Sequence, residues 1–285
     1  MHSKGFLSAI IVTAAGLILP TTSSATTINF TTATGTINVT TTSGDAVTLA
    51  VVGGCVEINS QQPIIDGGSA GCVAPGLLNA INITGDNAAN FVDLQLYTTA
   101  NGFPASRTTT INTLGGDDMI LTSNSWDFIT PGPGNDTINS GWGNEAASTF
   151  GNSDFISIYP TQSGTKSITS NAASVYFGGS LASDPISATI SASGAAITLS
   201  SSISALGVSS STVLNNGARS LAIELGSSSD SFTASTSMSG TAATLSTFSI
   251  QGGPGSDSIN IASIQRAADI LVYENADGAD TITGA

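Results

Sequence analysis

Acidic residues recur at every ninth position over one uninterrupted stretch of the chain, from Thr113 to Ser157. The five acids are Asp118, Asp127, Asp136, Glu145 and Asp154. A small or branched apolar residue follows two positions after each acid, and glycine or asparagine lies two positions before four of the five. Only 19 of the 285 residues are acidic, so this spacing is a repeat and not a chance alignment. Such a repeat is typical of a chain that stacks one small structural unit on the next.

Each nonapeptide has the pattern of a turn followed by a very short strand. The clearest copy lies outside the block, at residues 252–260, with the sequence GGPGSDSIN. Its glycines permit backbone conformations and close chain approaches that other residues do not. Asp257 ends the turn, and Ile259 is expected to face the interior of the protein. Because nine is odd, two nonapeptides are expected to complete one coil with two strands and two turns.

Acids that lie two nonapeptides apart should therefore stack on one edge of the coil. One edge is predicted to carry Asp118, Asp136 and Asp154, and the other Asp127 and Glu145. Stacked carboxylates one strand spacing apart, about 4.8 Å, repel each other. A hard divalent cation between successive turns would convert that repulsion into coordination.

Calcium is the cation that this ligand set favours. It accepts roughly six to eight oxygen ligands in flexible geometry, whereas magnesium demands a strict octahedron and keeps its waters. Zinc prefers histidine and thiolate ligands, which the block lacks. The candidate calcium ligands are Asp118, Asp136, Asp154, Asp127, Glu145, Gly116, Gly134, Asp257 and Asp280. The alternative interpretation is a set of ordinary Gly-Asn-Asp turns with solvated carboxylates.

Three copies carry a resemblance to a known family. Residues 132–138 (GPGNDTI) and 252–259 (GGPGSDSI) match the pattern GGxGxDxUx closely, and residues 275–283 match it well. On these residues the chain resembles the RTX, or haemolysin-type, family over about a quarter of its length. The resemblance implies a right-handed parallel β-roll that binds calcium, and it implies no particular biological role. Degenerate copies at 85–92 and 226–232 are interpreted as simple turns without a partner in register.

The N-terminus has the pattern of a secretion signal over residues 1–25. Lys4 is followed by an apolar run from Phe6 to Leu19 and by small residues that suit cleavage. The run is too short for a membrane span, and no later stretch is long enough. We therefore expect a secreted, extracellular protein, in some settings attached to a cell surface. Well-known RTX toxins lack such a signal, so the chain departs from them in export route.

Composition limits the partners and predicts one covalent link. The formal net charge is −14 with only five Lys and Arg residues, which argues against nucleic acid and anionic membranes as partners. Cys55 and Cys72 are the only cysteines, and in an oxidising compartment we expect them to form a disulfide. Closing that loop is expected to add about 3 kcal/mol of stability.

The strand and turn signals predict an all-β chain without convincing helices. The expected architecture is a right-handed parallel β-solenoid, with a β-roll in the repeat block and wider β-helix-like coils beside it. The predicted segments are the signal (1–25), an N-terminal β region with both cysteines (26–100), the calcium block (101–158), a Ser/Thr-rich solenoid region (159–250) and a second repeat section (251–285). The repeats stop where another copy would begin, so we expect a fragment of a longer chain.

Enzymatic function is disfavoured by the residue types present. The only histidine, His2, lies in the predicted signal, which excludes imidazole-based acid–base catalysis in the mature chain. One enzyme class stays open: a calcium-dependent β-helix polysaccharide lyase, or a related carbohydrate-active enzyme, with Arg107, Arg219 or Arg266 as the base.

A surface-binding module is the second alternative, because Thr-Ile-Asn recurs four times and threonine rows on flat faces can bind carbohydrate or ice. The main hypothesis is a secreted, non-catalytic calcium-binding β-solenoid. It would act as an extracellular structural or adhesive segment that orders when it binds calcium, with a cell surface or an extracellular polysaccharide as partner.

Overall fold

The computed structural model describes most of the chain after the predicted signal. The described residues are 26–140, 144–149, 154–158, 164–170, 174–178, 187–193, 196–203, 208–215, 220–234, 247–262, 270–273 and 279–284. The predicted secretion signal, residues 1–25, lies outside them.

The described residues are almost entirely β-structure, which confirms the all-β prediction. They form 24 strands and two 3-10 helices, η1 (Pro75–Leu77) and η2 (Thr99–Asn101). None of the helices in this part of the chain is long and apolar enough to cross a membrane. Val, Ile and Thr are frequent in the strands, where their branched side chains pack well on a pleated surface.

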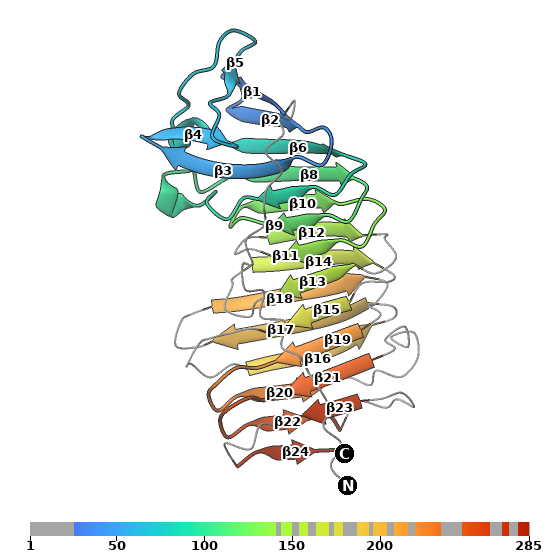
Figure 1. Ribbon diagram of the computed structural model, residues 1–285. Helices are drawn as coiled ribbons and strands as arrows, with labels where there is room; N and C mark the ends of the chain where they lie inside the picture. Colours follow the sequence, from blue (N-terminus) through green and yellow to red (C-terminus); the bar gives the residue numbers. More distant parts are fainter. Residues whose placement is uncertain are drawn as a thin grey trace.

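The strands form two sheets that run the length of the molecule, with one strand above the next (Figure 1). In spatial order, the larger sheet contains β24 (Thr281–Thr283), β22 (Ser258–Asn260), β20 (Ser231–Ala234), β16 (Ser187–Ser193), β17 (Ala196–Ile203), β18 (Val208–Asn215), β14 (Gly164–Ser170), β12 (Asn144–Thr149), β10 (Trp126–Thr130), β8 (Thr108–Leu114), β6 (Ala80–Asp86), β2 (Thr36–Thr40), β1 (Thr27–Thr31) and β5 (Ile64–Ile65). The smaller sheet contains β23 (Ile270–Tyr273), β21 (Thr247–Gln251), β19 (Ser220–Glu224), β15 (Ser174–Phe177), β13 (Phe155–Ile158), β11 (Thr137–Asn139), β9 (Met119–Leu121), β7 (Phe91–Asp93), β3 (Ala46–Val52) and β4 (Cys55–Ile58).

The nonapeptide repeat corresponds to one strand and one turn. From β8 to β13 the chain alternates between the two sheets, and each strand pairs in parallel with the strand two places further on. In the smaller sheet the register places Met119 beside Thr137 and Thr137 beside Phe155. Residues 18 apart are therefore neighbours, as the spacing of the acids predicts.

The core lies between the sheets and consists of inward side chains that stack along the molecule. Ile83, Ile111 and Ile129 are aligned across three strands of the larger sheet and are buried. An equivalent row in the smaller sheet contains Val92, Ile120, Ile138, Ile156 and Val175. Each fully buried Ile or Val contributes roughly 1.5–3 kcal/mol relative to an exposed one, so the apolar residue two places after each acid holds the stack together.

Four of the strand pairings in the described residues are antiparallel and interrupt this regular pattern. Two lie near the N-terminus, β1 with β2 and β3 with β4. The other two join β16, β17 and β18 within the larger sheet. β15 and β19 of the smaller sheet pair directly with each other, so β16 and β17 have no counterpart there. The Ser/Thr-rich segment thus contains an antiparallel excursion that its sequence did not predict.

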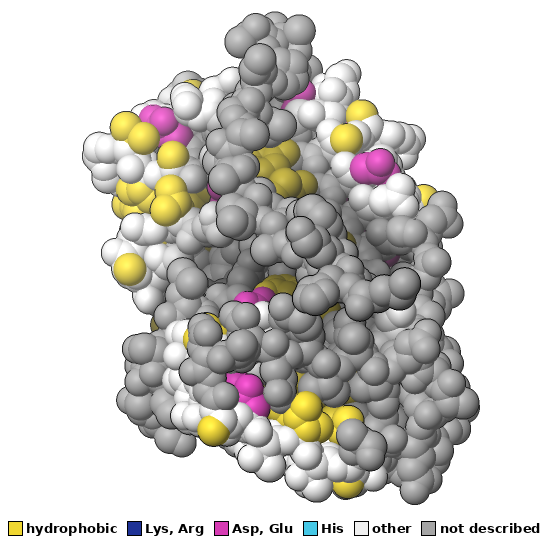
Figure 2. Space-filling view, turned by 60° about the horizontal axis from the view of Figure 1, so that its bottom comes forward, with side chains coloured by type: hydrophobic (Ala, Val, Ile, Leu, Met, Phe, Trp, Pro, Cys, Tyr) yellow, Lys and Arg dark blue, Asp and Glu magenta, His cyan; other side chains and the backbone are white. Residues whose placement is uncertain are grey.

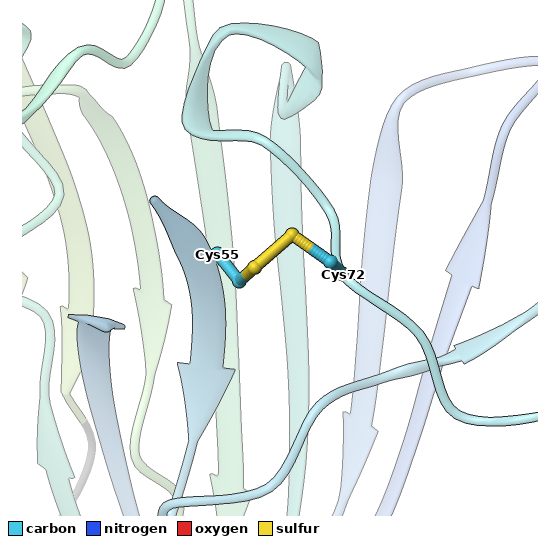
Figure 3. Close-up of a disulfide and its surroundings, with 2 residues drawn as sticks. All are labelled: Cys55 and Cys72. Carbon is cyan, nitrogen blue, oxygen red and sulfur yellow. A yellow bond between two sulfur atoms is a disulfide. The ribbon is translucent and has the colours of Figure 1, made fainter. Parts of the chain in front are cut away.

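The predicted disulfide is confirmed. Cys55, the first residue of β4, is bonded to Cys72, and their Cα atoms are 5.0 Å apart (Figure 3). Next to the bridge, the N–H of Val56 donates to the carbonyl of Val73 at 2.8 Å. The bridge ties the β3–β4 hairpin to the segment that leads into η1.

Candidate metal site

Three of the repeat acids form a buried column at one edge of the smaller sheet. Asp118, Asp136 and Asp154 each directly precede a strand of that sheet, and none is more than 2% exposed. The backbone N–H of Asp118 donates to Oδ1 of Asp136 at 2.9 Å, and the N–H of Asp136 donates to Oδ1 of Asp154 at 3.1 Å. The structure therefore brings these three predicted ligands together, each one strand from the next.

The column continues toward the N-terminus through a residue that the sequence analysis did not select. The N–H of Asn90 donates to Oδ1 of Asp118 at 2.8 Å, across 28 residues. The interpretation of 85–92 as a turn without a partner was therefore wrong. The extra residues of this step include η2, which lies between β7 and β8, so the usual 18-residue spacing is lost although the stacking is kept. We call Asn90, Asp118, Asp136 and Asp154 the first aspartate column.

A second aspartate column, Asp230, Asp257 and Asp280, lies in the C-terminal part. The N–H of Asp230 donates to Oδ1 of Asp257, and the N–H of Asp257 donates to Oδ1 of Asp280, both at 2.8 Å. The steps span 27 and 23 residues. The interpretation of 226–232 as an unpartnered turn was also wrong. These acids precede β20, β22 and β24 of the larger sheet, whereas the first column precedes strands of the smaller sheet.

Asp127 and Glu145 do not form the second edge that the spacing predicts. They are register partners, but both lie inside strands, β10 and β12, and not at turns. The Asp127 carboxylate is buried and accepts hydrogen bonds from the hydroxyls of Thr109 and Ser125 and from the N–H of Ser123. The Glu145 side chain lies outside the described part. Hydroxyl groups therefore satisfy Asp127 where the sequence predicted a cation.

The turn glycines are required because successive turns touch through their backbones. A Cβ on Gly134 would lie 1.8 Å from the carbonyl oxygen of Gly116, and a Cβ on Gly116 would lie 2.6 Å from that of Ala88. In the second column, a Cβ on Gly252 would lie 2.2 Å from Oδ2 of Asp257. Glycine thus leaves space both for the neighbouring turn and for the carboxylate under its own turn.

One carboxylate oxygen of several column members has no partner. Oδ2 of Asp118, Asp136 and Asp257 is buried and accepts no hydrogen bond from the described residues. Burial raises the pKa of all three carboxyls. For Asp136 it raises the pKa to about 6; the hydrogen bond from the Asp118 N–H opposes this, and the nearby Asp118 and Asp154 carboxylates add to it. Within the first aspartate column, Asp118 and Asp136 therefore each present a buried Oδ2 that accepts no hydrogen bond from the described residues.

The oxygen atoms present fit a hard cation better than a soft one. Among the described residues, no group of three or more Asp, Glu, His or Cys side chains surrounds a single point. Asp118 and Asp136, which are neighbours in the first aspartate column, would offer a cation the two Oδ2 atoms that accept no hydrogen bond. Both of these donors are oxygen, as calcium requires.

Comparison with known proteins does not assign the chain to a family. A scan of protein-family models finds no match, and neither do searches of curated proteins and of solved structures. The resemblance to RTX repeats thus depends on the motif residues alone and stays a prediction.

Of the three arginines proposed as a catalytic base, Arg107 is held in place by backbone carbonyl groups. Arg107 is buried, its Nε donates to the carbonyl of Tyr97 at 3.1 Å, and its Nη1 donates to that of Pro104 at 2.6 Å. The guanidinium carbon lies 5.1 Å from the centre of the Tyr97 ring. The other two candidates, Arg219 and Arg266, lie outside the described residues.

On one face of the molecule, the described acidic side chains form no continuous patch (Figure 2). Figure 2 shows the acidic side chains of one face as separate small areas, with no Lys or Arg among the described side chains of that face. Of the turn residues beside the first column, Asp117 is exposed, and its Oδ1 accepts the N–H of Asn135 at 2.8 Å. Sequence reasoning missed this outer contact, although the adjacent acids at 117 and 118 were a signal for it.

Proposed function

We propose that this chain is a secreted β-solenoid that binds calcium between successive coils and serves as an extracellular structural or adhesive segment. Right-handed parallel coiling, with a β-roll in the repeat block, is part of the proposal. The coiling is supported by the parallel pairing of residues 18 apart and by the alternation of strands between two sheets. Its right-handedness is what the resemblance to RTX repeats implies.

The observation that carries the calcium proposal is the unpartnered Oδ2 of the column aspartates. The same atom at the same motif position is buried without a donor in both columns, at Asp136 and at Asp257. Leaving a buried charged acceptor unsatisfied costs at least about 1–3 kcal/mol. A cation between neighbouring coils would remove that cost, and it would also offset the charge repulsion within each column.

Calcium binding of this kind would make the stability of the fold depend on the calcium concentration around the protein. In a calcium-poor environment the unpaired carboxylates destabilise the coil, and outside the cell bound calcium stabilises it by mass action. We place sites between Asp118 and Asp136, between Asp136 and Asp154, and between Asp257 and Asp280. Asp127 is already bound to hydroxyls, so no site is placed between it and Glu145.

Replacing one carboxylate by its amide tests the proposal directly. Asp136→Asn keeps an Oδ1 that accepts the N–H of Asp118 but removes the charge shared by two sites. We expect the calcium stoichiometry measured by isothermal titration calorimetry to fall by two sites, while the far-ultraviolet circular dichroism in chelator stays close to that of the wild type.

Asp117→Asn is the matched control, because it removes an exposed carboxylate next to the column and should leave the stoichiometry unchanged. Undiminished stoichiometry in Asp136→Asn, or equal losses in both variants, would reject the proposed sites. The lyase alternative receives no support from Arg107, whose guanidinium is buried against backbone carbonyls.

A further inference from the structure

The outward side of four adjacent strands of the larger sheet, β2, β6, β8 and β10, carries a regular grid of side chains. The strands are parallel and in register, so the outward residues that all four strands share form three rows. The rows are Thr36, Ala80, Thr108 and Trp126; Asn38, Asn82, Thr110 and Phe128; and Thr40, Thr84, Asn112 and Thr130. We call these twelve residues the Thr/Asn face.

The twelve residues of the Thr/Asn face include no ionisable side chain, although the chain as a whole has a net charge of −14. Asp86, which ends β6 beyond the third row, is half-buried, and its carboxylate accepts the N–H groups of Gly44 and Ala88. Recognition of an anionic polymer needs Lys or Arg, and a cationic partner needs acids; the face has neither. Nine of its twelve residues are Thr or Asn, which donate and accept hydrogen bonds while uncharged. The chemistry therefore suits a neutral partner rich in hydroxyl groups.

Two aromatic rings at one end of the face are exposed. Trp126 and Phe128 are 51% and 43% exposed, and their rings are nearly parallel, with an angle of 10° and centroids 6.1 Å apart. The two rings together form one contiguous apolar surface beside polar side chains, and aromatic rings offer wide apolar faces with little flexibility to lose. The C–H faces of pyranose rings pack against such aromatic faces.

The geometry of the face is fixed by the sheet. Neighbouring strands are about 4.8 Å apart, a spacing comparable with the length of one pyranose unit. Within the grid, Nδ2 of Asn82 donates to Oδ1 of Asn38 at 2.9 Å, so these amides are oriented before any ligand arrives. A preorganised surface binds with a smaller loss of side-chain entropy.

We propose that the Thr/Asn face binds a neutral polysaccharide, whose sugar rings pack on Trp126 and Phe128 and whose hydroxyls bond to the Thr and Asn rows. This proposal deepens the adhesive part of the proposed function and depends on it. Ice, the other partner that threonine rows can suit, offers no apolar ring face for the two aromatic side chains.

Retention on insoluble polysaccharides tests the proposal. The full chain, saturated with calcium, is mixed with microcrystalline cellulose, curdlan and mannan as neutral probes and with calcium alginate gel as an anionic one. We expect a saturable isotherm on at least one neutral probe and none on alginate. Trp126→Ala/Phe128→Ala should weaken retention about tenfold, or about 1.4 kcal/mol, because both apolar ring faces are lost.

Two further variants keep the test selective. Thr110→Glu places a charge beside Phe128 at the centre of the face and should also weaken retention. Phe155→Ala removes another exposed ring, on β13 of the other sheet, and should leave retention unchanged. Circular dichroism verifies that each variant is folded.

Four results would overturn the proposal: no retention on any neutral probe, equal retention on alginate, full retention by the Trp126→Ala/Phe128→Ala variant, or thermal hysteresis without retention. A folded chain that binds calcium but no polysaccharide would refute this inference alone. A chain that binds polysaccharide but no calcium would refute only the calcium proposal.

Discussion

At the residue scale, glycine and aspartate have separate tasks in each repeat. Glycine allows one turn to lie directly on the next, as at Gly134 above Gly116. The aspartate carboxylate is buried and accepts the N–H of the stacked residue 18 positions earlier, as Asp136 does from Asp118. The aspartate hydrogen bond depends on the glycine, because a larger turn residue would separate the backbones that this bond joins.

Gly134→Ala should destabilise the protein by steric overlap alone. The new Cβ would lie 1.8 Å from the Gly116 carbonyl oxygen, so the stacked turns must separate, at a cost of about 3 kcal/mol. Gly76→Ala is the control, since the nearest atom to its Cβ is 3.8 Å away and the change should stay within about 0.5 kcal/mol. Urea unfolding followed by circular dichroism measures both, and equal stability of the two variants would contradict the packing.

Asp127 should make stability depend on pH. Burial raises its pKa in the folded protein, so folding favours the protonated carboxyl. Its contribution to stability is complete below the unfolded value of about 3.9 and is lost as pH rises through the raised folded value. Compared with Asp127→Asn in chelator, the unfolding free energy of the wild type should therefore fall as pH increases from about 4. A difference that does not change with pH would show that the carboxyl titrates normally.

At the element scale, the strands and turns of the repeat block follow from sequence, but the irregular steps do not. Branched apolar residues at a fixed distance after each acid were sufficient to predict β9, β11 and β13. The positions of Asn90 and Asp230 were missed because their steps span 28 and 27 residues. Where the chain adds residues between stacked turns, the nine-residue spacing of the acids is lost. The hydrogen bond from a backbone N–H to the next aspartate carboxylate is nevertheless kept.

For Asp127 the predicted spacing was correct, but the predicted role was not. The sequence pattern placed this residue at a turn as a calcium ligand. Its register with Glu145 was predicted, yet it lies within β10 beneath a cluster of hydroxyls. The Ser123 and Ser125 side chains that satisfy it come from the preceding loop, and nothing in the spacing of acids indicates that loop.

The disulfide should stabilise the N-terminal elements selectively. Cys55 and Cys72 close a loop of 17 residues, and loss of such a link costs about 3 kcal/mol by chain entropy. Cys55→Ser/Cys72→Ser should accordingly increase amide hydrogen exchange in β3 and β4 while leaving β11 and β13 unchanged. Uniform exchange changes along the whole chain would contradict a local role.

At the scale of the whole molecule, the antiparallel excursion of β16, β17 and β18 separates two repeat sections. Before it, the aspartates precede strands of the smaller sheet, and after it they precede strands of the larger one. The sequence predicted two repeat sections. It did not predict that their aspartates precede strands of different sheets, because the residues between the sections carry no periodic acid. Long-range strand order depends on packing that short-range patterns do not encode.

The hydrogen bonds between strands follow the long axis of the stack (Figure 1), and this direction determines how the molecule would respond to tension. A pull on its two ends would load the terminal strand first and break its few bonds before the next strand bears force. The protein would thus lengthen in small steps, as one strand after another detaches from the sheet. A tether built this way would absorb mechanical work gradually, one strand at a time.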